Sequence, residues 1–150
     1  MVLARFIAAV FSRFSRRFSP SPENLAHALG QRGELIAAKH LRKQRYRVLY
    51  RNFRARGGGE VDIVCRDKAT GELVFIEVKT RATRDFGNPA HAVNFEKQKL
   101  IARGALAWLH LLDHPSIRFR FDIAEVIIGP DGASVNIIQN AFNLPEPYRY

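Results

Sequence analysis

Residues 59–81, GEVDIVCRDKATGELVFIEVKTR, decide the fold because they predict a β-hairpin of two strongly apolar strands. Residues 60–66 and 72–80 are rich in Val and Ile, and the DKATG sequence between them is typical of a tight turn. Side chains alternate between the two faces of a strand. In the first strand, one face is therefore expected to carry Val61, Ile63 and Cys65.

Three charged residues interrupt these apolar strands. Asp62 lies in the first strand, while Glu77 and Lys79 share one face of the second. The short turn is expected to bring Asp62 roughly opposite Glu77, with Lys79 beside them. Two adjacent carboxylates repel each other, and a divalent cation such as Mg²⁺ removes that cost. The structural alternative is a cross-strand salt bridge between Lys79 and one of the acids.

The segments on either side of the hairpin predict an α/β domain. In chain order we expect a helix, three strands, a second helix and two strands, at residues 23–44, 46–53, 60–66, 72–80, 91–112, 117–128 and 133–139. The strand–helix–strand passage predicts a parallel, right-handed crossover. This α-β-β-β-α-β core with a C-terminal strand predicts a mixed sheet flanked by helices. The expected parts of the chain are residues 1–21, 22–142 and 143–150.

Each predicted helix carries a stripe that indicates its face toward the sheet. The first stripe comprises Gly30, Glu34, Ala37, Ala38 and Leu41. The second comprises Val93, Leu100, Ile101, Gly104, Trp108 and Leu111. Glu34 is the one acid in an otherwise small or apolar stripe, so we group it with Asp62 and Glu77.

The chain is strongly basic, with 24 Lys and Arg against 14 Asp and Glu and a net charge of +10. The excess is concentrated, because residues 39–56 contain eight basic residues and no acid. This pattern favours a polyanionic partner, either nucleic acid or an anionic membrane surface. The expected phosphate contacts are Lys43, Arg54, Arg56, Arg81, Arg84 and Lys99.

Residues 1–21 predict a basic amphipathic helix with four arginines and no acid, ending in a Ser-Pro linker. Such a segment either lies on an anionic membrane or a protein partner, or is a terminal extension that packs on its own domain or stays disordered. The single cysteine permits no intrachain disulfide. The sequence shows neither a secretory pattern nor an apolar stretch of about 20 residues, so a cytoplasmic location is expected.

The hairpin motifs resemble those of a known family. Residues 59–64 and 75–81 are similar to the bipartite PD-(D/E)xK motif of restriction-endonuclease-like nucleases, although Val61 stands where the motif has proline. The wider pattern, over about residues 30–142, resembles the bacterial YraN family, which is related to archaeal Holliday junction resolvases. The further matches are Gly33-Glu34, Asn52-Phe53-Arg54, Phe86-Gly87 with Pro89, Lys97 to Lys99, Arg120-Phe121-Asp122 and Ala141-Phe142.

This resemblance implies a metal-dependent nuclease with a defined set of site residues. It assigns Mg²⁺ or Mn²⁺ binding to Asp62 and Glu77, with Glu34 as a supporting acid. It assigns catalysis to Lys79. It adds the backbone carbonyl of Val78 as a further ligand, and it places Gln98 of the second helix near the site as a polar residue.

Three functions are therefore open. The first is a Mg²⁺-dependent endonuclease acting on branched or otherwise structured DNA, and the combination of Asp62, Glu77 and Lys79 favours it because a pure binder has no need for such a set. The second is a binding module with the same fold and basic surface but no useful turnover. The third is an adaptor anchored to a membrane or partner through residues 1–21. By analogy with nucleases that need two sites to cut two strands, a homodimer is expected.

Overall fold

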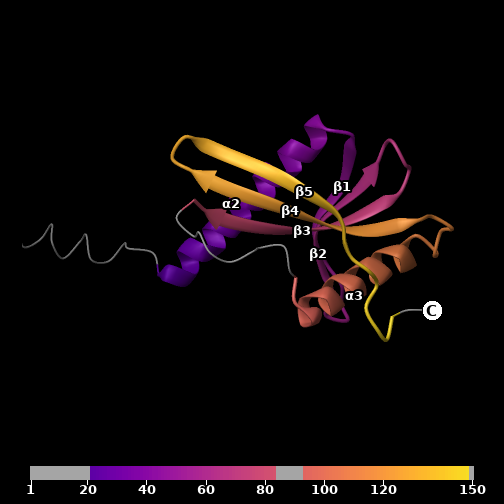
Figure 1. Ribbon diagram of the computed structural model, residues 1–150. Helices are drawn as coiled ribbons and strands as arrows, with labels where there is room; N and C mark the ends of the chain where they lie inside the picture. The colour runs from indigo at the N-terminus through magenta and orange to yellow at the C-terminus, as the bar shows by residue number, and fades with distance from the viewer. Residues whose placement is uncertain (1–20, 84–92, 149–150) are drawn as a thin grey trace, which may run out of the picture.

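The computed structural model describes residues 21–83 and 93–148 (Figure 1). Its elements in chain order are α2 (Pro22–Lys43), β1 (Tyr46–Arg54), β2 (Glu60–Asp67), β3 (Leu73–Ala82), α3 (Phe95–Leu111), β4 (Phe119–Gly129) and β5 (Gly132–Phe142). The predicted order of elements is confirmed, and β5 extends beyond its expected end at residue 139. Residues 1–20, for which an amphipathic helix is predicted, lie outside the described residues.

The five strands form one mixed sheet in the order β1-β2-β3-β4-β5. Strands β1, β2 and β3 pair antiparallel, β3 and β4 pair parallel, and β4 and β5 pair antiparallel. The parallel pair confirms the predicted crossover, which runs through α3. Strand β3 carries Glu77 and Lys79 and lies in the middle of the sheet, so its side chains are covered from both faces.

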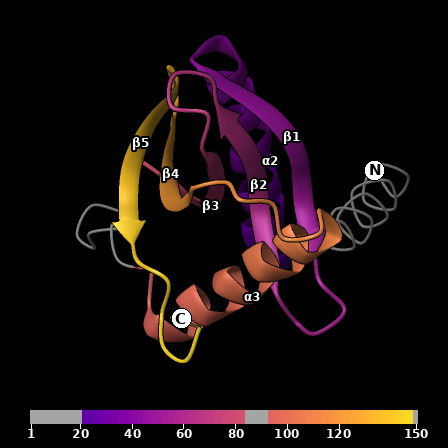
Figure 2. The same ribbon diagram turned by 90° about the vertical axis from the view of Figure 1, so that its right-hand side faces the viewer.

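The two helices cover opposite faces of the sheet (Figure 2). Helix α2 packs against one apolar cluster, which includes Cys65 and Ile76 from the sheet. Helix α3 packs against a second cluster, which includes Val64 and Phe75, their immediate neighbours in sequence. Alternation along the strands thus supplies two separate cores. None of the helices in the described part of the chain is long and apolar enough to cross a membrane.

Helix α2 is fixed at both its start and its middle. The Ser21 side chain caps the helix by accepting a hydrogen bond from the Asn24 backbone N–H at 3.2 Å, and Pro22 suits the first turn. Farther along, the buried residue is Gly33 rather than the predicted Gly30. A Cβ at Gly33 would lie 1.8 Å from Oγ1 of Thr80, so only glycine permits this close approach to β3. That contact places the next residue, Glu34, beside the sheet.

Helix α3 begins with an equally defined cap and approaches β2 closely. The Asn94 side chain accepts a hydrogen bond from the Lys97 backbone N–H at 2.9 Å. A Cβ at Gly59 would lie 2.2 Å from the Gly104 backbone nitrogen, so the start of β2 rests directly on the helix backbone. The predicted apolar stripe is correct at Ile101 and Gly104 and wrong at Leu111, which is 68% exposed because the helix extends past the sheet at this end.

A buried ion-pair network joins the start of β3 to β4. The Arg120 guanidinium donates to Asp122 at 3.0 Å, to Asp67 at 3.0 Å and to Glu72 at 2.8 Å. Asp67 and Asp122 are fully buried, and each accepts a further hydrogen bond, from the Ala69 and Asn140 backbone N–H groups respectively. We call Arg120, Asp67, Asp122 and Glu72 the Arg120 network. Every acid in it has a charged or hydrogen-bonded partner.

Candidate functional site

Strands β2 and β3 separate at the two predicted acids. Their antiparallel pairing runs from Arg66–Leu73 to Ile63–Ile76 and ends there, so the next positions in the same register are Asp62 and Glu77. Oδ2 of Asp62 instead accepts a hydrogen bond from the Val78 backbone N–H at 2.8 Å. A carboxylate therefore occupies the place of the next strand-to-strand bond, and the hairpin brings Asp62 and Glu77 together as predicted.

The side-chain alternation of β2 changes at Asp62. We expected Val61, Ile63 and Cys65 to share a face, but Val61 packs in the α3-side cluster while Ile63 and Cys65 pack in the α2-side cluster. The expectation for Val61 is wrong because β2 no longer pairs with β3 at this point, and the close contact of Gly59 with α3 draws the start of β2 toward that helix. The side chains on either side of Asp62 in the sequence therefore belong to different clusters, Val61 to the α3 side and Ile63 to the α2 side.

Glu77 is buried beside charged neighbours, with only 4% of its surface exposed. Burial raises its pKa to about 7, the Asp62 charge adds to the increase, and Lys97 and Lys79 partly offset it. Nζ of Lys79 lies 3.3 Å from Oε1, and Nζ of Lys97 lies 3.4 Å from Oε2. Oε2 is nevertheless buried without a hydrogen-bond partner among residues 21–83 and 93–148, because the Lys97 ammonium is near it but not aligned with it.

Lys97 is the residue that the sequence analysis missed as a member of this site. Its ammonium group contacts both Glu60 and Glu77, and only 23% of its side chain is exposed. Burial alone would lower the pKa of Lys97, but the hydrogen bond to Glu60 and the charge of Glu77 raise it, so the ammonium form is stabilised. Its place in the first turn of the helix that follows β3 was the available signal, since a crossover helix begins over the strand that precedes it.

The charges continue outward from Lys97 to the surface. Glu60 pairs with Lys97 on one side and with Arg54 on the other, where Nη1 of Arg54 lies 3.1 Å from Oε2 of Glu60. The hydrogen bond from Lys97 lowers the pKa of Glu60 more than burial raises it. Together with Glu77, these ion pairs connect the buried site to Arg54, whose side chain is 78% exposed.

Glu34 approaches the same acids from helix α2. Burial raises the pKa of Glu34, and the charge of Asp62 raises it further, while a hydrogen bond from Asn52 and the charges of Arg51 and His27 act in the opposite direction. Asp62 therefore influences both Glu34 and Glu77, and the three acids form one electrostatic group. Within residues 21–83 and 93–148, however, no three or more Asp, Glu, His or Cys side chains are arranged to hold a metal ion.

Gln98 and the Val78 backbone were also predicted to contribute to the site. Nε2 of Gln98 donates to the Val93 backbone carbonyl at 2.8 Å, so this side chain secures the start of α3, and no described hydrogen bond links it to the acids. The Val78 backbone does reach the site, because its N–H group binds Asp62, and the role of its carbonyl as a metal ligand stays a prediction.

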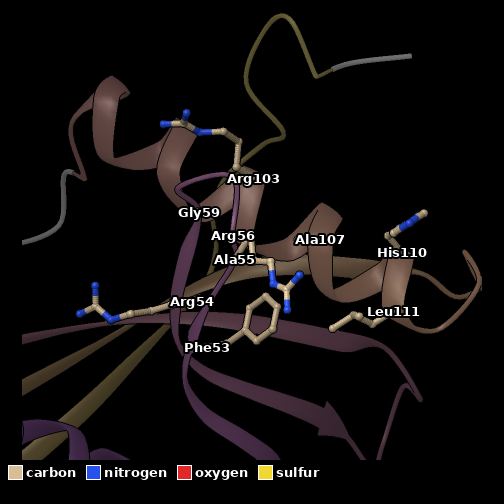
Figure 3. A pocket seen from close by; sticks show the side chains of 10 residues that line it. Phe53, Arg54, Ala55, Arg56, Gly59, Arg103, Ala107, His110 and Leu111 are labelled. Atoms are coloured by element: carbon tan, nitrogen blue, oxygen red, sulfur yellow. The ribbon is translucent and has the colours of Figure 1, made fainter.

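The predicted phosphate contacts are spread over several elements. Lys43 is exposed at the end of α2, and Arg81 is half-buried near the end of β3. Lys99 pairs with Glu96 at 2.8 Å and covers the Phe95 ring. Arg54 and Arg56 line a surface pocket between the β1–β2 turn and α3 (Figure 3). Arg84 lies outside the described residues.

These features define a mixed α/β protein whose central strand carries a buried acid–lysine cluster. The chain belongs to the uncharacterised protein family UPF0102, whose model matches residues 33–126. It is 51% identical over 117 residues to a UPF0102 protein of Geobacter sulfurreducens, which covers 77% of this chain and 89% of the relative. It is 44% identical to one of Pelobacter propionicus (86% and 94%) and 42% identical to one of Symbiobacterium thermophilum (79% and 99%). The YraN family identified from the motifs is this family.

Proposed function

We propose that this protein is a Mg²⁺-dependent endonuclease that hydrolyses phosphodiester bonds of structured or branched DNA, with its active site at Asp62, Glu77 and Lys79. The observation that carries the proposal is the buried Oε2 atom of Glu77, which has no hydrogen-bond partner in the described part of the chain and lies where β2 and β3 separate. A buried carboxylate oxygen without a partner is costly, and such atoms are retained mainly where function requires them.

The donor set fits a hard divalent cation. Asp62 and Glu77 present carboxylate oxygens from neighbouring strands, and Mg²⁺ is commonly held by one or two carboxylates, with waters and substrate phosphates completing its coordination. The described residues place no third donor ready beside these two carboxylates, which is compatible with that chemistry. When bound, the cation would polarise the phosphodiester and lower the pKa of the attacking water.

The protein's own residues then have separable tasks. Asp62 is held in place by the Val78 N–H group, and Glu77 is oriented between two ammonium groups. Lys79 has 35% of its side chain exposed, so it can reach a substrate and orient the attacking water or stabilise the negative charge that develops on the phosphate. Lys97 is more enclosed and acts as a positioning residue for Glu77.

The test is a cleavage screen with duplex, flap, four-way junction and RNA substrates, in Mg²⁺, Mn²⁺ or EDTA. We expect cation-dependent cleavage in the wild type and its loss in Glu77→Gln and Lys79→Met. Lys68→Met is the matched control, because Lys68 is exposed in the β2–β3 turn. Lys79→Arg separates the two roles of the lysine, since a guanidinium keeps its proton and cannot act as a base. Absence of cleavage on every substrate would reject the proposal.

Metal binding is tested separately by calorimetry with Mn²⁺. We expect Asp62→Asn to bind the ion at least tenfold more weakly than the wild type, because one of the two carboxylates is lost. Equal binding by the two proteins would contradict metal binding at Asp62, independently of the result of the cleavage screen.

A second candidate function is a catalytically quiet nucleic-acid-binding module. The observation in its favour is that Lys79 and Lys97 already neutralise Glu77 without a metal ion. This module would bind nucleic acid equally well with and without Mn²⁺, and Glu77→Gln would leave that binding unchanged. For a nuclease we expect nucleic-acid binding to depend on Mn²⁺ and to change in Glu77→Gln, because Glu77 and the substrate phosphate would bind the same cation.

A further inference from the structure

A pocket of about 640 Å³ lies beside the candidate site, between the β1–β2 turn and helix α3 (Figure 3). Its volume is in the range of cavities that enclose small organic ligands. None of the residues that line it is acidic, and the guanidinium-bearing residues are Arg54, Arg56 and Arg103. This combination predicts a ligand that is both anionic and partly apolar.

The apolar part of the pocket consists of Phe53 from β1 and Ala107 and Leu111 from α3. In Figure 3 the Arg56 guanidinium lies beside the Phe53 ring, whereas Arg54 and Arg103 both extend away from that ring, toward the left of the view. The described ion pairs involve neither Arg56 nor Arg103, so both remain available for an external anion. A flat apolar group thus fits inside the pocket, and negative charges fit at its rim.

The walls of this pocket are held in place before any ligand binds. Gly59 rests against the backbone of Gly104, which fixes the β1–β2 turn on α3. Phe53 is packed by Tyr50 and Trp108, with ring centroids 6.0 Å and 5.2 Å away. A preformed surface of this kind binds a ligand without a cost for ordering the protein.

We propose that this pocket binds an unpaired nucleobase of a single-stranded nucleic-acid segment, with the flanking phosphates on Arg54, Arg56 and Arg103. A nucleobase offers an apolar π-face, and the phosphates on either side supply the negative charge that the rim lacks. In a duplex the bases are stacked and paired, so they cannot enter a pocket of this depth without being extruded. This assignment deepens the proposed function, on which it rests for the class of ligand.

A chain of ion pairs connects the pocket to the acid cluster. Arg54 lines the pocket and also pairs with Glu60, which pairs with Lys97 beside Glu77. A strand held in the pocket would therefore run next to the phosphodiester at the acid cluster. The substrate class that this arrangement selects is nucleic acid with an unpaired segment beside the cleaved bond, such as a flap or a junction arm.

The experiment measures fluorescence anisotropy in EDTA, where binding is separated from cleavage. The probes are a labelled thymidine dodecamer, an abasic chain with the same number of phosphates, and a blunt duplex. We expect the wild type to bind the dodecamer about tenfold more tightly than the abasic chain, the scale of the loss when one base is deprived of its stacking partner. In Leu111→Ser this ratio should fall to near one, and Arg56→Gln should weaken binding of both single strands severalfold.

Matched controls are available on the same chain. Leu25→Ser replaces another exposed leucine, on α2 at the opposite face of the sheet, and Arg66→Gln replaces an exposed arginine at the other end of β2. Both should bind like the wild type. Equal affinity for the dodecamer and the abasic chain, or wild-type affinity ratios in Leu111→Ser, would overturn the pocket assignment. If the pocket assignment fails but the protein cleaves DNA, the proposed endonuclease function stands. If the pocket binds single strands but no substrate is cleaved, the pocket assignment stands and the endonuclease function is rejected.

Discussion

The Arg120 network and the Asp62–Glu77 group lie at opposite ends of the paired part of β2 and β3, and their carboxylates differ in how completely they are hydrogen-bonded. In the Arg120 network, every carboxylate is answered by the guanidinium, and Asp67 and Asp122 also accept backbone hydrogen bonds. In the Asp62–Glu77 group, one oxygen of Glu77 has no hydrogen-bond partner among the residues that the structure describes, and burial raises the pKa of Glu77 to about 7.

This contrast distinguishes an acid group that stabilises the fold from one that is kept ready for a ligand. In a closed set of partners each charge offsets part of the desolvation cost of the others, so the loss of one partner leaves an uncompensated buried charge and destabilises the fold. A carboxylate left partly unanswered costs stability, and that cost is offset only when another cation or a substrate arrives. The predictions below follow from this difference, in order of decreasing effect.

The largest effect is expected when the Arg120 network loses its cation. Arg120→Met leaves two fully buried carboxylates without their main partner, which should lower the free energy of unfolding by about 3–5 kcal/mol. Urea unfolding followed by the fluorescence of the single tryptophan, Trp108, measures it. Arg118→Met is the control, because Arg118 is 80% exposed and only approaches Glu72. A loss below about 1 kcal/mol would mean that the network isn't a stabilising element.

Glu77→Gln should behave in the opposite way. The amide removes a buried charge that the fold does not satisfy completely, so the free energy of unfolding in EDTA should stay within about 1 kcal/mol of the wild type. Cleavage should nevertheless fall by at least about a hundredfold, the scale associated with losing one stabilising group in an active site. Destabilisation as large as that of Arg120→Met would place Glu77 among the structural acids and contradict the comparison.

The sequence predicted the Asp62–Glu77 group better than the Arg120 network. The Asp62–Glu77 pair follows from a short hairpin and the two-residue period of strands, which are local properties. The Arg120 network depends on Tyr46, Asp67 and Asp122 meeting across three strands, and the sequence analysis noted the Arg-Phe-Asp motif without assigning it a structural role. Long-range pairing of this kind isn't encoded in any single window of sequence.

The same limit applies inside the candidate site. Lys97 comes to Glu77 only because the crossover returns α3 over β2 and β3, and the depth of that contact depends on two glycines, Gly59 and Gly104. The change of phase at Val61 also has a tertiary cause, because it occurs where β2 leaves β3. Element order, the acids and Lys79 were thus predictable from local patterns, whereas Lys97 and the neighbouring pocket were not.

The Arg120 network should also govern part of the acid sensitivity of the fold. Burial would raise the pKa of Asp67, but the hydrogen bonds from Ala69 and Arg120 and the charge of Arg45 lower it overall. A depressed folded-state pKa stabilises the protein above the ordinary pKa of an aspartate, and this contribution is lost as the pH falls through the folded value. Asp122, whose pKa burial raises, acts in the opposite direction and reduces the net effect.

Comparing the wild type with Asp67→Asn by urea unfolding from pH 7 to pH 3 isolates the Asp67 contribution. The variant should be less stable at pH 7, and the difference between the two proteins should begin to shrink below about pH 4, where the unfolded chain takes up the proton before the folded protein does. A difference that stays constant over the whole range would show that Asp67 stabilises the fold through its hydrogen bonds alone.

The smallest effect is expected when the ammonium group of Lys97, which already lies near Glu77, is removed. Lys97 holds an ammonium 3.4 Å from Oε2 of Glu77, where it repels an incoming divalent ion. Lys97→Met should therefore raise the affinity for Mn²⁺ severalfold, measured as free Mn²⁺ by electron paramagnetic resonance. Lys99→Met is the matched control, since Lys99 lies on the same helix but pairs with Glu96. Unchanged affinity in Lys97→Met would mean that the ammonium and the metal ion do not compete for this carboxylate.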